Sequence, residues 1–338
     1  MLTRFFIALL IPASLVAGPP GDVVEASAPQ ERAPQERATP PGTNDPIASE
    51  SAMPNLPSPT AGGLQFWSDV RVRDDHRVQF NAVTGRYRMI DDAGVRRAWG
   101  NRDACLAELE RRRPWTLADN DGRTVTILLH GLMRTRHCME PMAAAVRERG
   151  GPAVAIGYAS TRRGVADHAV TLGEVIADWP VSWRLRFVAH SMGNIVTRCW
   201  VGDRIRSGET AILDRCEAMV MLGPPNQGSS IATSLRRTGV FGMVAGSGGM
   251  QMGPAFDEVR GRLATPPFPF AIIAGDVSHY PVQNPLLDGP NDLLVTVEET
   301  RLAGAVKHVT VPCPHARLME RADVVDQSVE LLGQIAPR

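Results

Sequence analysis

A serine between small residues ends an apolar stretch in the middle of this chain. Residues 185–193 read L-R-F-V-A-H-S-M-G, so Ala189 and Gly193 lie two positions to either side of Ser191. This spacing suits a sharp strand-to-helix turn, where larger side chains would collide and the hydroxyl is pushed out over the sheet edge. A serine held in this way can act as a nucleophile. The alternative is an ordinary strand-to-helix turn whose serine only caps the helix.

A nucleophilic serine needs a histidine as its base, and three histidines follow it in the chain: His279, His308 and His315. His315 comes just after the apolar run 306–311, in a loop before the final helix, where the base is expected. His308 lies inside that run, which favours a structural role. His279 comes early, at a strand end where the acid belongs. We therefore expect His315 to be the base.

The acid that orients the histidine should lie between the serine and the histidine in the chain. Asp292 occupies the tight turn G-P-N-D at residues 289–292, which can hold a carboxylate rigidly enough to fix the imidazole tautomer. Asp276 directly follows a predicted strand and is the main alternative. We expect Asp292 to be the acid. The other carboxylates considered are Asp288, which is expected to be a turn residue, and Glu298.

A second apolar strand ends in His130-Gly131, some sixty residues before the serine. Acyl transfer needs two backbone N–H groups aimed at the oxyanion of the tetrahedral intermediate. Met192, the residue after the serine, would supply one, and either Leu132 or Met133 would supply the other. Gly131 allows close backbone approach, and His130 is expected to orient this loop rather than to titrate.

The pattern around these residues is an alternation of strands and helices, which predicts an α/β fold with a mostly parallel sheet covered by helices on both faces. Catalytic groups should then lie at the carboxyl ends of the strands. The expected strands are 125–129, 153–158, 184–189, 218–222, 270–274 and 306–311, and the expected helices are 105–111, 139–149, 165–179, 194–206 and 322–335.

The first part of the chain has a different character. Arg4 and the apolar run 5–17 predict a signal peptide or an N-terminal anchor in residues 1–17, and so an exported protein that is periplasmic, extracellular or anchored in an inner membrane. Residues 18–63 are rich in Pro and Ala and predict a disordered tether. Residues 64–121 predict short strands and a helix joined to the core, with a turn at Thr84-Gly85, and the catalytic domain is expected to span 122–338.

Composition argues against several function classes. The formal net charge is zero, so nothing indicates binding of nucleic acid, and membrane association is expected only through the N-terminus. The five cysteines show no metal-ligand spacing, so no metal is expected, and their odd number leaves at least one thiol unpaired. We expect them to be small buried apolar residues. No cofactor is expected.

The motifs resemble those of the α/β-hydrolase superfamily, in particular its bacterial lipase and esterase branch with an A-H-S-M-G elbow. The likeness covers about Val125 to Ile335, including the loop 222–229, and does not extend to 64–121. It implies an α/β-hydrolase fold and hydrolysis of a small-molecule or lipid carboxylic ester through a Ser-His-Asp triad and an acyl-enzyme. In that branch the acid turn commonly reads Asp, an apolar pair and Val, which supports Asp292 over Asp276. The chain lacks the branch's His-Gly-Gly run.

Two other functions fit the same residues. An acyltransferase would use the same triad but pass the acyl group to an alcohol or thiol, and a catalytically inactive binding domain would keep the fold alone. The Gly- and Met-rich segment 242–253 is either a mobile cap over an acyl site or a plain loop.

Overall fold

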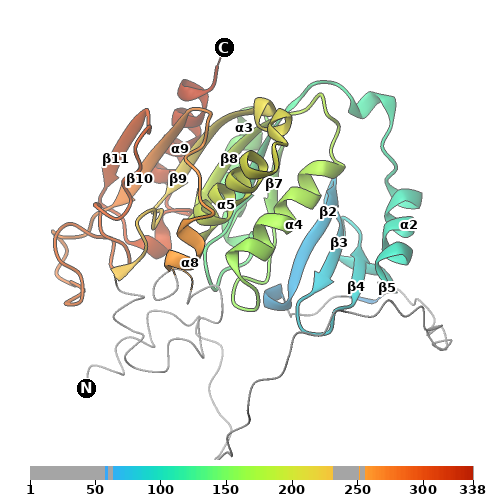
Figure 1. The fold of residues 1–338 in the computed structure, drawn as a ribbon, viewed down its shortest axis with the longest axis horizontal. Helices are drawn as coiled ribbons and strands as arrows, with labels where there is room; N and C mark the ends of the chain where they lie inside the picture. The colour runs from blue at the N-terminus through green and yellow to red at the C-terminus, as the bar shows by residue number, and fades with distance from the viewer. Residues whose placement is uncertain (1–57, 60–63, 231–250, 252–255, 338) are drawn as a thin grey trace, which may run out of the picture. The chain divides into compact units, whose positions relative to one another are not determined.

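Two β-sheets organise the part of the chain that the computed structural model describes, residues 58–59, 64–230, 251 and 256–337 (Figure 1). The larger sheet has six strands in the order β11-β10-β9-β8-β6-β7, and all neighbouring strands are parallel. Its strands are β6 (Thr124–Leu129), β7 (Ala153–Ile156), β8 (Arg184–His190), β9 (Cys216–Leu222), β10 (Phe270–Gly275) and β11 (Lys307–Val311).

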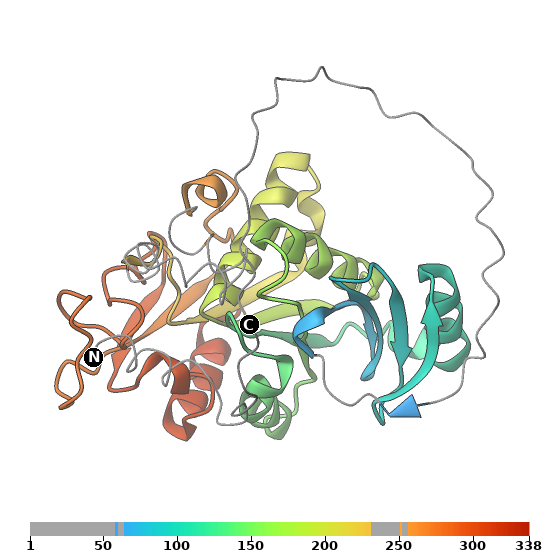
Figure 2. The same cartoon turned by 90° about the horizontal axis from the view of Figure 1, so that it is seen from below.

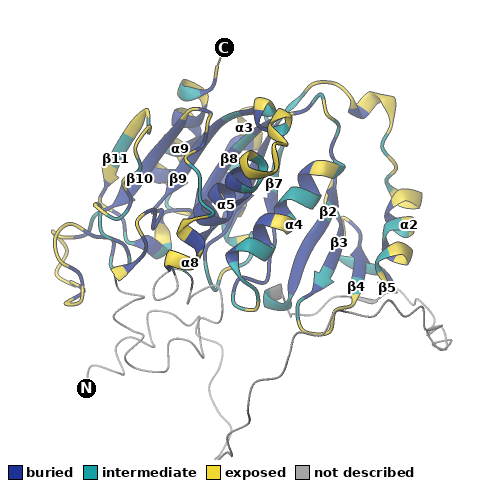
Figure 3. Cartoon of the chain, in the orientation of Figure 1, coloured by how far each residue is buried: buried dark blue, intermediate teal, exposed yellow. Residues whose placement is uncertain are grey.

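The central strands of this sheet are buried almost throughout, as the dark blue ribbons of Figure 3 show. A strand covered on both faces has no solvent side, so its sequence is a continuous apolar run rather than an alternation. Residues 127–129 of β6, 187–189 of β8 and 218–222 of β9 are such runs, and each is at most 1% exposed.

Helices cover both faces of the larger sheet. Figure 2 shows α3 (Glu140–Glu148) and α9 (Ala322–Ile335) on one face, and α4 (Val165–Asp178) and α5 (Met192–Ser207) on the other. In α9, Val325, Val329 and Leu332 recur at helical spacing and are buried against the sheet. The expected α/β architecture, with a parallel sheet and helices on both faces, is confirmed. Shorter helices are η3 (Arg136–Met139), η4 (Thr210–Arg215), α8 (Phe256–Arg260) and η6 (His315–Arg317).

The second sheet is antiparallel, and it has a core of its own that includes Val78, Met89 and Leu109. The sequence predicted short strands joined to the core but did not identify a separate sheet, and it missed β5, whose sequence V-R-R-A-W-G lacks apolar alternation. The sheet order is β1 (Ser58–Pro59), β5 (Val95–Gly100), β4 (Tyr87–Ile90), β3 (His76–Asn81), β2 (Trp67–Arg73), with α2 (Arg102–Arg112) and the 3-10 turns η1 (Leu64–Phe66) and η2 (Leu117–Asp119) completing this part.

The start of the folded region is earlier than expected. Ser58 and Pro59 pair with Arg96 and Val95, so these two residues of the expected tether belong to the antiparallel sheet. The expected signal or anchor, 1–17, and the remainder of the tether lie outside the described residues, as does the segment 242–253 apart from Gln251.

Two further expectations concern the described part of the chain. All five cysteines are free thiols. Four of them are buried, as expected, whereas Cys138 is half-buried. Within the described ranges, none of the helices combines the length and the apolar character that crossing a bilayer requires.

The two sheets are joined through β2, which packs against α4. The Asp69 N–H donates to the Gly157 carbonyl (2.8 Å), and the Asp69 carboxylate accepts the Gly157 N–H (2.7 Å). Arg77 lies 2.5 Å from the same carboxylate, and both side chains are nearly inaccessible, at 4% and 0% exposed. The indole of Trp179 adds a hydrogen bond to the Val72 carbonyl (2.8 Å). The junction is therefore a fixed contact that contains a buried ion pair.

Breaking this ion pair should cost far more stability than breaking an exposed one. Asp69→Asn leaves Arg77 with only its longer contact to the exposed Asp75 (3.2 Å), and we expect it to lower the free energy of unfolding by about 3 kcal/mol. The control is Asp326→Asn, which breaks the 3.5 Å pair with Arg149. The Asp326 side chain is 69% exposed and the Arg149 side chain is 47% exposed. That change should cost about 0–1 kcal/mol. Urea unfolding measures both, and equal losses would contradict the prediction.

Candidate active site

Ser191 occupies a strained turn between β8 and α5. Its φ is 53° and its ψ is −122°, a region that residues with a side chain rarely adopt. The Ser191 N–H donates to the Leu222 carbonyl (2.9 Å), and the Asn194 amide donates to the Ser191 carbonyl (3.0 Å). The parallel neighbour β9 and the first turn of α5 thus hold the backbone in this conformation. The predicted sharp turn is present at the expected position.

Close packing requires a small residue at Gly193, two positions after the serine. A Cβ added at Gly193 would lie 2.8 Å from the Leu129 carbonyl oxygen and 2.9 Å from that of His130, inside the contact distance of backbone atoms. Ala189, on the other side, is fully buried and pairs with Leu129 across the sheet. The start of α5 therefore packs directly on the end of β6, which brings the two predicted loops together.

His315 lies in η6, directly beyond β11, and contacts both of its expected partners. Its Nε2 is 2.9 Å from the Ser191 Oγ, and its Nδ1 is 2.7 Å from the Asp292 Oδ2. The His315 N–H also donates to the Asp292 carbonyl (2.9 Å). Asp292 thus holds both the backbone and the ring of His315, and the ring nitrogen facing the serine is positioned to accept the hydroxyl proton.

Asp292 is completely buried, and its charge is compensated by the backbone of its own turn. Its Oδ1 accepts the N–H groups of Leu294 (3.0 Å) and Val295 (2.7 Å), which leaves Oδ2 for His315. Leu293, the next residue, has a φ of 83°, and the Asn284 amide holds its carbonyl (2.7 Å). Hydrogen bonds therefore hold both the carboxylate and the backbone of this turn.

The other candidates lie elsewhere. The Asp276 Oδ1 accepts from the Ser278 backbone N–H (2.9 Å) and hydroxyl (2.6 Å). His308 bonds the Thr300 hydroxyl through Nε2 (2.8 Å). His279 packs edge-on against Tyr280, Asp288 is exposed, and Glu298 pairs with Arg301 (2.7 Å).

His130 is a fixed hydrogen-bonding group beside this site. The Tyr158 N–H donates to its Nε2 (3.3 Å), so the proton is on Nδ1, which donates to the Gly131 carbonyl (2.8 Å). Burial lowers the pKa of His130 to about 4, so the ring is neutral near pH 7. A Cβ added at Gly131 would lie 3.1 Å from the Ser191 Cβ, so this loop lies against the serine.

The backbone amides expected to bind an oxyanion differ in their partners. The Met133 N–H is occupied, because it donates to the Ser160 hydroxyl (3.0 Å). Leu132 and Met192 have no hydrogen-bond acceptor for their N–H groups within the described part of the chain. Met192 is the first residue of α5, where amides have no intrahelical partner. The structure thus favours Leu132 over Met133 as the available donor.

Sequence reasoning missed several residues that surround the site. Tyr158 and Ser160 follow β7, the neighbour of β6, and the rule that parallel strands end at one edge could have drawn attention to them. His190 donates through Nε2 to the His315 carbonyl (3.0 Å), and burial, reinforced by the nearby His315, lowers its pKa well below the usual range. No sequence pattern indicated Asn194, because its side chain acts through a hydrogen bond to the Ser191 backbone carbonyl.

Comparison with known proteins gives likeness in structure alone. No protein-family model matches the chain, and no curated protein matches it in sequence. Among solved structures, the mature form of the Bacillus licheniformis lipase BlEst2 is 16% identical, with a TM-score of 0.52 over 64% of this chain and 94% of that one. The metagenomic carboxyl esterase MGS0156 is 15% identical, with a TM-score of 0.50 over 66% of this chain and 77% of that one. With the parallel sheet and its helix layers, these likenesses show that the chain has the α/β-hydrolase fold.

Proposed function

We propose that this chain is a serine hydrolase that cleaves carboxylic esters. The observation that carries the proposal is the unbroken hydrogen-bond chain from Asp292 through His315 to Ser191, on the strained turn beyond β8. A serine, an imidazole and a buried carboxylate in this order form the unit that activates a hydroxyl for attack on a carbonyl carbon. A binding domain without catalysis would have no need of it.

The proposed reaction uses the three side chains in turn. The Ser191 Oγ attacks the ester carbonyl carbon while the His315 Nε2 accepts the hydroxyl proton. Asp292 stabilises the imidazolium through its bond to Nδ1. The tetrahedral intermediate then expels the alcohol, which takes the proton from His315, and an acyl-enzyme remains. A water molecule attacks the acyl carbon with His315 again as base, and the carboxylic acid and free serine are released.

The oxyanion would be bound by the N–H groups of Leu132 and Met192. Both amides lack a protein acceptor within the described ranges, and Gly131 brings the first loop against the serine. Donors that are fixed before the reaction stabilise the developing charge without reorganisation. His130 supports this loop in its neutral form, since its two ring nitrogens are already engaged.

The choice of a carboxylic ester as substrate is supported by the proteins that share the fold. One of them is described as a lipase and the other as a carboxyl esterase. The substrate class proposed here is accordingly a small-molecule or lipid ester.

Removing the nucleophile tests the proposal most directly. Ser191→Ala should lower ester hydrolysis by about 10⁴-fold or more with the fold intact, because the three residues act as a unit. A fluorophosphonate probe should label Ser191 in the natural chain, as peptide mass mapping can determine. The matched control is Ser182→Ala, since Ser182 precedes β8, at the opposite end of that strand from Ser191, and its hydroxyl bonds the Asn120 side chain. Turnover retained in folded Ser191→Ala would exclude this mechanism.

Comparing two carboxylates tests the acid. Asp292→Asn should reduce kcat by about 10⁴-fold, since an amide cannot hold the required imidazole tautomer. Asp276→Asn is the control, because the Asp276 carboxylate accepts hydrogen bonds from Ser278 rather than from His315. Steady-state kinetics on a short-chain ester separates the two variants, and a larger loss for Asp276→Asn would reverse the assignment.

We further propose export through residues 1–17, on the basis of Arg4 and the apolar run 5–17. A reporter enzyme that is active only outside the cytosol should function when fused after residue 63. The same fusion without residues 1–17 should be inactive. Equal reporter activity with and without this segment would argue against export by this route.

A further inference from the structure

The loop that carries Leu132 is held in an unfavourable backbone conformation. Met133, the next residue, has a φ of 59°, which residues with a side chain seldom adopt. Such a conformation persists only where neighbouring groups fix it. The groups that fix it here come from outside the loop and the triad.

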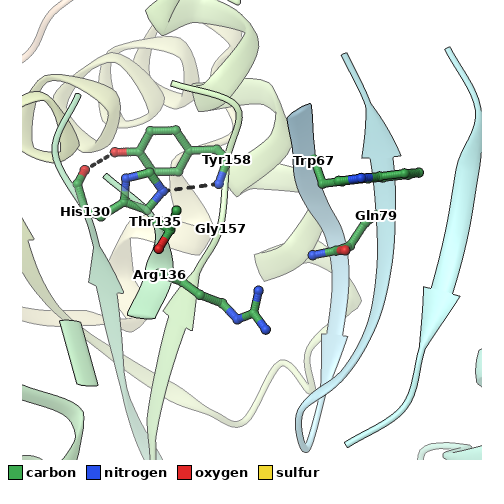
Figure 4. A pocket seen from close by; sticks show the side chains of 7 residues that line it. All are labelled: Trp67, Gln79, His130, Thr135, Arg136, Gly157 and Tyr158. Atoms are coloured by element: carbon green, nitrogen blue, oxygen red, sulfur yellow. Dashed lines mark hydrogen bonds between the residues drawn. The ribbon is translucent and has the colours of Figure 1, made fainter. Parts of the chain in front are cut away.

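Two residues beyond β7 make the direct contacts. The Ser160 hydroxyl accepts the Met133 N–H (3.0 Å), and the Tyr158 hydroxyl donates to the His130 carbonyl. The Tyr158 ring also stacks on His130, with ring centroids 4.0 Å apart and planes within 10° of parallel. Figure 4 shows this stack with both dashed bonds between the two residues. The loop is thus fixed at both of its ends.

The segment 157–160 is in turn fixed by the antiparallel sheet. Asp69 of β2 exchanges two hydrogen bonds with Gly157, and the Ser68 hydroxyl accepts the Ala159 N–H (3.1 Å). All three residues at 68, 69 and 159 are at most 2% exposed. Trp67 and Gln79 of the same sheet line a small pocket together with His130 and Tyr158 (Figure 4). These contacts form a continuous path from β2 to the loop.

We propose that the antiparallel sheet positions the oxyanion loop, and that Ser160 and Tyr158 are the positioning residues that transmit its support. By engaging the Met133 N–H, Ser160 leaves the Leu132 N–H as the free donor and keeps it in place. This inference rests on the proposed function, because it assigns support for the oxyanion that function requires. It gives residues 64–121 a role in catalysis without contact to substrate.

The test separates binding of the oxyanion from binding of the substrate. In Ser160→Ala and Tyr158→Phe, kcat should fall by roughly 10- to 100-fold, while KM should stay within about twofold. A trifluoromethyl ketone matched to the substrate's acyl chain forms a hemiketal oxyanion with the serine. Its affinity should fall by the same factor as kcat/KM. The unfluorinated ketone should bind all variants equally, and Ser182→Ala should match the natural chain throughout.

The outcomes distinguish this proposal from the one on which it rests. If the natural chain hydrolyses no ester and takes up no fluorophosphonate, the proposed function fails and this inference falls with it. If the natural chain is active and both variants bind the fluorinated ketone as tightly as it does, only the positioning role is overturned. Equal losses of affinity for both ketones would indicate general disruption and would also overturn it. Tyr158→Phe keeps the ring stack, so it provides the comparison if Ser160→Ala unfolds in a thermal melt.

Discussion

The sharp backbone turn at Ser191 is the constraint on which the rest of this site depends. Its positive φ is unfavourable for a serine, so the conformation needs support from both sides. The Leu222 carbonyl supplies it from β9, and the packing of Gly193 on the end of β6 supplies it from α5. Because strands β6, β8 and β9 are adjacent and parallel, the sheet itself delivers these groups to one edge.

Four buried polar side chains around this turn have distinct electrostatic roles. Burial lowers the pKa of His130 and of His190, so both are neutral and serve as fixed hydrogen-bond partners. Asp292 is held by two backbone N–H groups and by His315. Among these histidines, only His315 contacts both the carboxylate and the serine. The geometry therefore places His315 for proton transfer, whereas His130 and His190 hold the neighbouring backbone.

The antiparallel sheet adds a second kind of support. Its contact with segment 157–160 includes the hydrogen bonds of Asp69 and Ser68, and the buried ion pair with Arg77 holds Asp69 in place within the sheet. Hydrogen bonds have stricter geometry than apolar packing. Such a contact can hold segment 157–160, and through it the loop bearing Leu132, in one position. The loop bearing Leu132 lies between this support and the serine, so the positions of the two sheets are coupled at the candidate site.

The sequence by itself determined the order of strands and helices around the parallel sheet, the serine turn, and the loop positions of Asp292 and His315, because these depend on short-range patterns of apolar, glycine and proline residues. The G-P-N-D turn favoured Asp292 over Asp276, but the contact between the Asp292 carboxylate and the His315 ring is visible only in the structure, because it depends on which side chain reaches the ring. Ser160 and Tyr158 bond the Met133 N–H and the His130 carbonyl, which are remote from them in the chain, and Asn194 bonds the Ser191 carbonyl at the serine turn. Only the tertiary structure decided their roles, because a hydrogen bond to a backbone atom leaves no pattern in the partner's sequence.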